Sequence, residues 1–224
     1  MPVNLLIAVK SCWPDMLNGF HDIIRSTWGR DVKCDLRFFV GTPPQSRIVQ
    51  NDEIVLDVPD GYHDLPYKTR EILRRSRNLW YDFTLICDTD SYINYNKLMS
   101  SGFENYDYFG VNSKPLGQTF DYTAVDRDGR NHHIKNCYPW MSGGYGYIVS
   151  RKAAEFIVKA EPNIWAEDMF VGNTLGPLGA KGEIKIANMD KENLPTRHFP
   201  QSRYHSGYDP RFHWMEEVHA EQSK

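Results

Sequence analysis

The sequence predicts an α/β protein of one domain, in which helices flank a mixed, mainly parallel sheet. Three observations predict this fold. Short apolar runs recur along the chain, segments with helical spacing separate them, and no linker or internal repeat divides the 224 residues. Nearly continuous apolar runs are typical of strands that a parallel sheet buries on both faces. A hydrophobic content of 41% in a chain of this length supports one sizeable core.

The first half of the chain alternates strands with helices. The opening helix starts at Pro14, a residue favoured in the first helical turn, and glycine or proline ends the second strand. The predicted strands cover residues 4–11, 36–41, 53–56 and 83–87, and the predicted helices cover residues 14–29 and 65–80. This order predicts a nucleotide-binding half over about residues 1–94. No glycine-rich phosphate loop follows the first strand, which argues against a dinucleotide dehydrogenase or a P-loop enzyme.

The second half is less regular. Its polar stretch could be a hairpin or a mobile loop, and its neighbouring His132 and His133 diverge if they lie in a strand, which disfavours a metal site there. In order, we expect a strand over 106–111, the polar stretch over 114–136, a glycine- and aromatic-rich segment over 138–150, helices over 151–160 and 168–175, a late edge strand over 183–186, and a polar tail over 216–224.

Two carboxylates mark the end of the fourth predicted strand. Asp88 and Asp90 are separated by one residue, and in an open α/β sheet the carboxyl ends of the strands are where ligands bind. Hard oxygen ligands at this spacing suit Mg²⁺ or Mn²⁺ beside a nucleotide phosphate. The simpler alternative is that Asp88 caps a turn and Asp90 is solvated.

A second pair of acids, Glu167 and Asp168, begins a predicted helix. The helix dipole favours acids there, and that alone accounts for them. A carboxylate at this place also serves as a general base if it faces the same crevice as Asp90. Three histidines follow late in the chain, at positions 198, 205 and 213, and one of them is a candidate further metal ligand.

Composition restricts the function classes. A net charge of −3 gives no electrostatic footprint for nucleic acid. No apolar run is long enough to span a bilayer, and Met1 leads into the first strand without the pattern of a signal peptide. Four scattered cysteines without Cys-x-x-Cys spacing disfavour zinc and are expected to be reduced. We therefore expect a cytoplasmic protein.

An ordered set of segments resembles a known family. These segments are Ile24-Arg25-Ser26-Thr27-Trp28-Gly29, Tyr67-Lys68-Thr69, Asp88-Thr89-Asp90-Ser91-Tyr92-Ile93-Asn94, Tyr138-Pro139 with Ser142-Gly143-Gly144, and Glu167-Asp168-Met169-Phe170-Val171-Gly172. They are similar to motifs of the β-1,3-galactosyltransferase and N-acetylglucosaminyltransferase family, to which the Fringe enzymes are related. The resemblance covers about residues 4–206.

The resemblance implies a GT-A type fold, a UDP-sugar donor, Mn²⁺ or Mg²⁺, and an inverting transfer of a hexose or N-acetylhexosamine to an acceptor hydroxyl. The product would carry a β-linkage, expected to be β-1,3. About residues 95–215 would form the acceptor and catalytic half. The resemblance assigns metal binding to Asp90, Asp88 and His205, catalysis to Asp168 with Glu167 beside it, and donor binding to Asp88, Arg25, Lys68, Ser142, Gly143 and Gly144. Trp140, Tyr145 and Trp165 are candidates for stacking on sugar rings.

Two features depart from the family pattern. Thr89 stands where the family has a middle aspartate, which leaves a plain Asp-x-Asp whose flanking carboxylates do the binding. The membrane anchor and disulfides usual in Golgi members are not evident, so the Golgi lumen is expected only if the chain was trimmed from a longer one. Two alternatives stay open: a metal-dependent nucleotidyltransferase or phosphohydrolase, and an inactive sugar-binding relative. The oligomeric state, donor sugar and acceptor (glycan or another hydroxyl compound) are not readable from the sequence.

Overall fold

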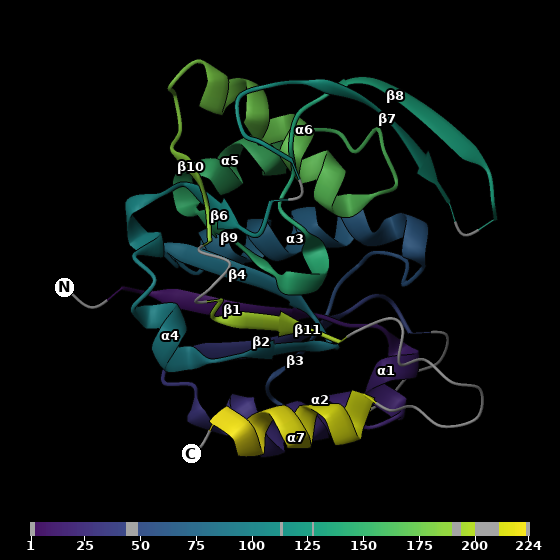
Figure 1. Cartoon of the computed structure of the whole chain (residues 1–224). Helices are drawn as coiled ribbons and strands as arrows, with labels where there is room; N and C mark the ends of the chain where they lie inside the picture. The colour runs from purple at the N-terminus through teal and green to yellow at the C-terminus, as the bar shows by residue number, and fades with distance from the viewer. Residues whose placement is uncertain are drawn as a thin grey trace.

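A seven-stranded mixed sheet forms the centre of the molecule, and helices cover both of its faces (Figure 1). The computed structural model describes residues 3–43, 49–112, 114–126, 128–189, 194–199 and 211–222. The strand order is β10-β6-β9-β4-β1-β2-β3, and only β9 pairs antiparallel to its neighbours. The predicted fold, a mixed and mainly parallel sheet flanked by helices in one domain, is confirmed.

The strands of this central sheet and its helices have the following bounds. The strands are β1 (Leu5–Lys10), β2 (Asp35–Val40), β3 (Glu53–Val55), β4 (Phe83–Asp88), β6 (Tyr108–Gly110), β9 (Tyr147–Ser150) and β10 (Ile186–Asn188). The helices are α1 (Trp13–Leu17), α2 (Phe20–Ser26), α3 (Leu65–Asn78), α4 (Tyr95–Met99), α5 (Arg151–Lys159), α6 (Glu167–Ala180) and α7 (Arg211–Gln222).

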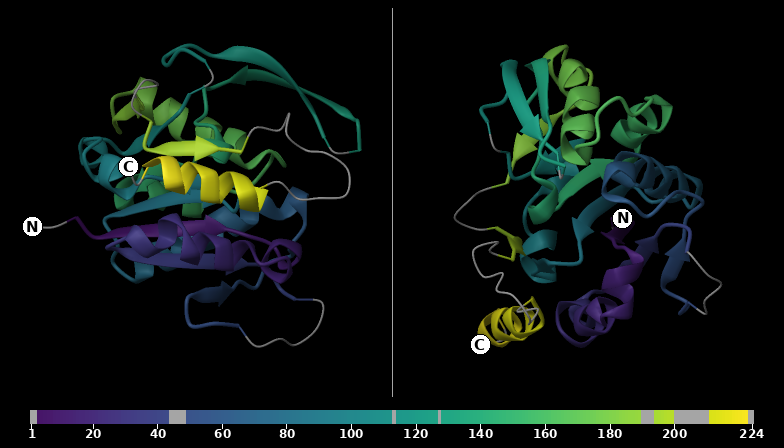
Figure 2. Two further views of the ribbon diagram at one scale, coloured as in Figure 1. Left: turned by 60° about the horizontal axis from the view of Figure 1, so that its bottom comes forward. Right: turned by 90° about the vertical axis from the view of Figure 1, so that its right-hand side faces the viewer.

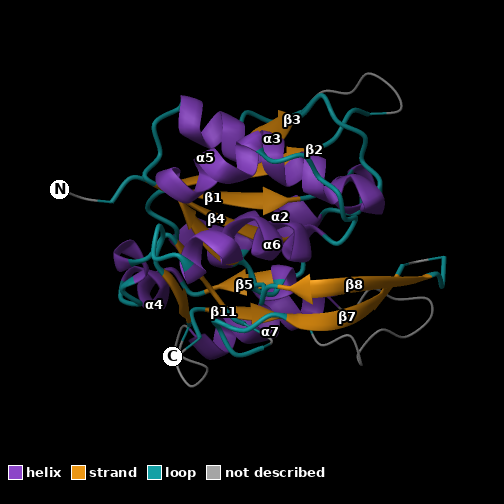
Figure 3. Ribbon diagram, turned by 90° about the horizontal axis from the view of Figure 1, so that it is seen from above, coloured by secondary structure: helices purple, strands orange, loops and turns teal. Residues whose placement is uncertain are grey.

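Two smaller ladders complete the fold. β5 (Ser91–Ile93) pairs antiparallel with β11 (Thr196–His198), so that a late segment of the chain lies beside the segment that follows Asp90. β7 (Phe120–Val125) and β8 (Asn131–Cys137) form a hairpin that projects from the body of the molecule (Figure 3). The polar stretch over 114–136 is therefore a hairpin.

The alternation of side chains along β1 divides the core into two layers. Leu5, Ile7 and Val9 belong to a cluster that includes residues of α2, α4 and α7. Leu6 and Ala8 point to the opposite face, where α3, α5 and α6 supply the packing residues. Figure 2 shows these helices and the pair α2 and α7 on opposite sides of the sheet. Lys10 continues the second set and therefore lies on the face that α6 covers.

Several predicted boundaries differ from the structure. Gly19, at φ 87°, separates α1 from α2, so the helix predicted over 14–29 is two shorter helices. The helix predicted over 168–175 continues to Ala180, and the predicted edge strand lies slightly later, as β10. The polar tail predicted over 216–224 is wrong in part, because α7 continues to Gln222 and buries Val218 against the core.

None of the helices in the described ranges combines the length and the apolar character needed to cross a membrane. The four cysteines are unpaired.

Candidate active site

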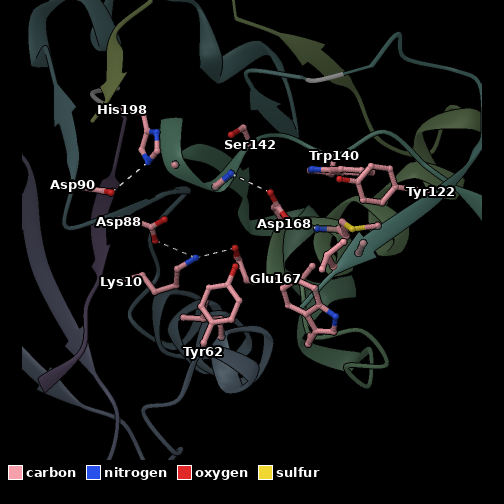
Figure 4. Close-up of a pocket in the computed structure, with 18 residues that line it drawn as sticks. Lys10, Tyr62, Asp88, Asp90, Tyr122, Trp140, Ser142, Glu167, Asp168 and His198 are labelled. Carbon is pink, nitrogen blue, oxygen red and sulfur yellow. Dashed lines mark hydrogen bonds and ion pairs between the residues drawn. The ribbon is translucent and has the colours of Figure 1, made fainter. Parts of the chain in front are cut away.

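Three strands and one helix meet at a single cleft of about 940 Å³ (Figure 4). Lys10 ends β1 and pairs in register with Asp88, which ends β4. The turn Gly143–Tyr145 precedes β9, and because β9 runs antiparallel, this turn lies at the same edge of the sheet. Helix α6 brings Glu167 and Asp168 to the opposite wall. The structure therefore gathers at one place acids that lie far apart in the sequence.

Lys10 connects the two acidic segments at the floor of the cleft. Its Nζ lies 2.8 Å from Glu167 Oε2 and 3.3 Å from Asp88 Oδ1, and its side chain is only 3% exposed. Burial alone would lower the pKa of Lys10, but Asp88 and Glu167 raise it above its ordinary value. Burial also raises the pKa of Asp88, to about 6, against the opposing effect of Lys10. This ammonium therefore holds the end of β4 and the start of α6 together.

Glu167 is buried and uses both carboxylate oxygens inside the protein. Lys10 binds Oε2, while the hydroxyls of Thr69 and Tyr147 both donate to Oε1. A carboxylate that three buried groups hold in this way is well placed to fix the first turn of α6.

Asp168 follows Glu167 in α6 and lines the cleft as well. Its Oδ2 accepts a hydrogen bond from the Gly143 N–H at 3.5 Å, and its Oδ1 accepts one from the Met169 N–H at 2.9 Å. Burial and the neighbouring Glu167 raise the pKa of Asp168 to about 6, against the opposing effect of Lys10. A cleft carboxylate with a pKa near neutrality is suited to accept a proton from a bound molecule.

Asp90 lies beside a histidine on the other side of the cleft. The ladder β5–β11 carries His198 to this place, and its Nε2 is 3.4 Å from Asp90 Oδ2. The contact with Asp90 raises the pKa of His198, which its burial opposes. Asp90 Oδ1 is buried and finds no hydrogen-bond partner within the described part of the chain. A buried carboxylate oxygen without a partner, next to an imidazole nitrogen, fits a divalent cation such as Mn²⁺.

Gly144 makes room for this histidine. A Cβ atom at position 144 would come within 2.6 Å of the His198 ring, whereas one at Gly143 would meet its nearest neighbour at 3.5 Å. The carbonyl of Gly144 also accepts a hydrogen bond from Ser91 Oγ at 2.9 Å. Ser142, Gly143 and Gly144 all line the cleft, and the two glycines leave its wall without side chains there.

The outer part of the cleft is aromatic. Tyr62, Tyr122, Trp140 and Trp165 line it, and Tyr62 and Tyr122 each expose 37% of their surface. Tyr122 comes from the projecting hairpin and packs against Trp140, with ring centroids 5.1 Å apart. Of the predicted stacking residues, Trp140 and Trp165 therefore lie in the cleft wall, while Tyr145 packs beside His198 instead.

Lys68 lines a second hollow of about 260 Å³, which adjoins the cleft and shares Asp88 and Asp90 with it. Its Nζ is fully buried and binds the carbonyl of Ser11 at 2.7 Å and the carboxylate of Asp60. Asp60 also accepts from the backbone N–H groups of Trp13 and Gly41. The lysine therefore fixes the loops around the hollow.

Arg25 is the predicted site residue that the structure places elsewhere. Its guanidinium pairs with Asp22, Asp52 and Glu53, and it lines neither the cleft nor the second hollow. The Ile24–Gly29 motif is thus part of the packing of α2. His205, predicted as a metal ligand, lies outside the described residues.

Two residues that line the cleft were not predicted as site residues: Lys10 had no predicted role, and His198 was one of three candidate histidines, of which His205 was assigned to the metal. In the sequence, Lys10 resembles an ordinary polar residue at the end of a strand. Because it lies an even number of residues from Leu6 and Ala8, its side chain is expected on the same face of the sheet as theirs. His198 lies in a three-residue strand with no apolar alternation, so the sequence around it does not indicate that it pairs with β5. The apolar Phe199, which the structure buries fully, was the one sign in the sequence that this segment packs against the core.

Comparisons with known proteins bear on this site. Residues 21–185 match the model of the galactosyltransferase family, and this range includes both acidic pairs and the glycine turn. The chain belongs to the galactosyltransferase family. The match leaves open which branch of the family it represents, and a search among curated proteins finds no match.

Two solved structures show distant resemblance to this galactosyltransferase-family chain. One is a glycosyltransferase involved in glycosylation of the major capsid of PBCV-1, with 12% identity and a TM-score of 0.49, covering 97% of this chain and 100% of that chain. Another is 2-C-methyl-D-erythritol 4-phosphate cytidylyltransferase from Thermus thermophilus, with 12% identity and a TM-score of 0.45, covering 97% and 98%. At such values neither resemblance assigns an activity to this chain.

Proposed function

We propose that this chain is an inverting, metal-dependent transferase that moves a hexose or N-acetylhexosamine from a UDP-sugar to an acceptor hydroxyl, forming a β-linkage, expected to be β-1,3. One observation carries the proposal. Asp168, whose pKa is raised to about 6, and the Asp90–His198 pair face one cleft from opposite sides (Figure 4). Membership of the galactosyltransferase family supports a nucleotide-sugar donor.

Asp90 and His198 would hold Mn²⁺ or Mg²⁺, with Asp88 close by. A divalent ion bound there offsets the negative charge that develops on the departing diphosphate. No set of three His, Cys, Asp or Glu side chains among the described residues forms a complete metal site, so the nucleotide and water would supply further ligands. Lys10 keeps Asp88 in place through its 3.3 Å contact.

Asp168 would act as the general base. It takes the proton of the acceptor hydroxyl while that oxygen bonds to the anomeric carbon and the bond from this carbon to the diphosphate breaks. A transfer of this kind needs one base, inverts the anomeric centre, and passes through a transition state like that of glycoside hydrolysis. Glu167, held by Lys10, Thr69 and Tyr147, would position the helix turn that carries the base.

The two ends of the cleft would bind the two substrates. The nucleoside half of the donor fits the second hollow, because this hollow shares Asp88 and Asp90 with the cleft. The acceptor fits the aromatic end, where the exposed faces of Tyr62 and Tyr122 offer stacking surface for an apolar sugar face.

Product analysis tests the proposal. The protein is incubated with Mn²⁺ and a panel of α-linked UDP-sugars, and proton NMR follows the anomeric signals with time. We expect UDP and a first-formed β-anomer, from transfer or from slow transfer to water. Release of pyrophosphate or of inorganic phosphate would instead support the nucleotidyltransferase or phosphohydrolase alternative, and a first-formed α-anomer would contradict the single-base route.

A further inference from the structure

A serine, a histidine and a glutamate form a buried chain of hydrogen bonds beside the second hollow. His21 Nδ1 lies 2.7 Å from Glu53 Oε1, and His21 Nε2 lies 2.8 Å from Ser11 Oγ. His21 lies in α2, Glu53 in β3 and Ser11 directly after β1, and each residue is at most 5% exposed. Ser11 lines the second hollow, and none of the three has a role in the proposed mechanism.

Glu53 determines which nitrogen of His21 carries a hydrogen. Glu53 Oε1 also accepts from Arg25 Nη2 at 2.9 Å, and Oε2 accepts from the Gln50 N–H at 2.8 Å. Burial would raise the pKa of Glu53, but the hydrogen bond from His21 and the two others lower it. Glu53 is therefore a carboxylate, which can only accept, and Nδ1 of His21 carries the hydrogen.

The surroundings keep His21 neutral. Burial lowers the pKa of His21, against the opposing effect of Glu53, and the nearby charge of Arg25 adds to the lowering. The ring of His21 stacks on that of Phe38, with centroids 4.2 Å apart. A neutral imidazole with its hydrogen on Nδ1 has a lone pair on Nε2, so the contact with Ser11 Oγ is one in which the hydroxyl donates.

Ser11 has one polar capability left after these contacts. Its N–H donates to the Phe39 carbonyl at 2.9 Å, and its carbonyl accepts from Lys68 Nζ at 2.7 Å. The hydroxyl has a single hydrogen, for which the Cys12 carbonyl, at 3.4 Å, is a longer contact than His21 Nε2. What remains are the lone pairs of Oγ, which accept a hydrogen bond and cannot donate one.

The order of these contacts is that of the triad of serine hydrolases, in which the acid orients the histidine and the histidine takes the serine proton. A hydrolase also needs backbone N–H groups directed at an oxyanion. Here the N–H of Ser11 binds the Phe39 carbonyl. The N–H groups of Trp13 and Gly41 bind Asp60. The chain therefore orients a hydroxyl and does not activate a nucleophile.

We infer that the Ser11 hydroxyl accepts a hydrogen bond from the nucleoside of the donor, and that His21 positions it for this contact. This role rests on the proposed function, since it concerns the nucleotide of that reaction and places its nucleoside in the second hollow. The matching groups are the N3–H of uracil and the ribose hydroxyls, whereas N3 of cytosine has no hydrogen and would place a lone pair against Oγ. Ser11 is thus a specificity-determining residue, and His21 is a positioning residue.

Titration calorimetry with Mn²⁺ tests this role with UDP, CDP, 2′-deoxy-UDP and 3′-deoxy-UDP, since each analogue lacks one candidate donor group. The wild type should bind at least one analogue roughly 5- to 50-fold more weakly than UDP, and that analogue identifies the donor group. Ser11→Ala should weaken UDP binding but not binding of that analogue, so the ratio of the two affinities should fall by roughly fivefold or more. An unchanged ratio, or an equal loss for all four nucleotides, would overturn the inference.

His21→Phe tests the positioning. It keeps an aromatic ring against Phe38 and keeps Ser11, but it removes the acceptor of the hydroxyl hydrogen, so the hydroxyl can turn and donate. The affinity ratio should fall toward that of Ser11→Ala, whereas a merely structural role of His21 would weaken all four nucleotides alike. A wild-type ratio in His21→Phe would contradict the role of His21.

Ser26→Ala is the matched control. Ser26 also lies in α2, its hydroxyl donates to the Ile23 carbonyl at 3.1 Å, and it lines neither the cleft nor the second hollow, so its ratio should equal that of the wild type. Circular dichroism first shows that each protein is folded. A folded wild type that binds none of the four nucleotides would contradict the proposed function, and the role of Ser11 with it. Equal binding of all four by the wild type would contradict the role of Ser11 alone.

Discussion

Asp168 is expected to lower stability while it supports activity, and Asp168→Asn tests both effects in one variant. Its pKa is 3.8 in a free side chain and about 6 in the folded protein, mainly because of burial. The folded state therefore binds the proton more tightly than the unfolded state. Above pH 6 the carboxylate is ionised in both states and costs folding free energy; as the pH falls from 6 to below 3.8 this cost disappears.

The size of this free-energy cost follows from the shift in the pKa of Asp168. About two pKa units at roughly 1.36 kcal/mol each give up to about 3 kcal/mol. Asp168→Asn should therefore raise the free energy of unfolding at pH 7.5 by up to about 3 kcal/mol, and by much less at pH 4. In contrast, its transfer or hydrolysis rate at pH 7.5 should fall by about 10²- to 10⁴-fold, with UDP binding largely kept.

The assays are urea unfolding at the two pH values and the rate of UDP release. Asp22→Asn is the matched control, since Asp22 is 74% exposed on α2 and should change neither quantity by much. In the wild type, kcat should decline as the pH falls below about 6, because protonated Asp168 cannot accept a proton. A variant Asp168→Asn that keeps near-full activity, or that is less stable than the wild type at pH 7.5, would refute this reasoning.

Two other substitutions test the supports of the site. Lys10→Met leaves Asp88 and Glu167 without their buried partner and should lower the free energy of unfolding at pH 7.5, measured in urea titrations, by about 3–5 kcal/mol. The control is Lys159→Met, at a side chain 70% exposed, which should change this free energy little. Similar values for the two variants would contradict the buried bridge. Gly144→Ala would push a methyl group against the His198 ring and should weaken Mn²⁺-dependent UDP binding, measured by calorimetry, by roughly tenfold or more. Gly143→Ala is the control, because its added methyl group would meet its nearest neighbour at 3.5 Å, and it should bind UDP more nearly like the wild type. The opposite order of affinities would rule out this role of Gly144.

The central strands β1 and β4 were predictable because they are buried on both faces. The runs at residues 4–11 and 83–87 contain little that is polar, and a segment of this kind cannot be stable at a surface. The same logic placed Asp88 and Asp90 at the carboxyl edge of the sheet. Family motifs then indicated that Asp168 and the turn Ser142–Gly144 meet these acids, and the structure brings all of them to one cleft.

What the sequence did not predict depends on contacts between distant segments. The ladder that brings His198 to Asp90 joins two segments far apart in the chain through three residues with no distinctive pattern. The motif around Arg25 resembles a binding motif, but the Arg25 guanidinium forms ion pairs with Asp52 and Glu53, which are near it only in the folded structure. The break at Gly19 was missed because the apolar spacing continues on both sides of it, while a positive φ at one glycine is enough to turn the chain.

The metal-dependent release of UDP is the most direct test of the central proposal. Wild type and Asp90→Ala are incubated with each of a panel of UDP-sugars, once with Mn²⁺ and once with EDTA, and free UDP is measured. We predict that the wild type releases UDP from at least one sugar nucleotide with Mn²⁺ only, and that Asp90→Ala releases almost none. UDP release that is equal with Mn²⁺ and EDTA, or equal in the two proteins, would contradict the assignment of Asp90 and with it the proposed mechanism.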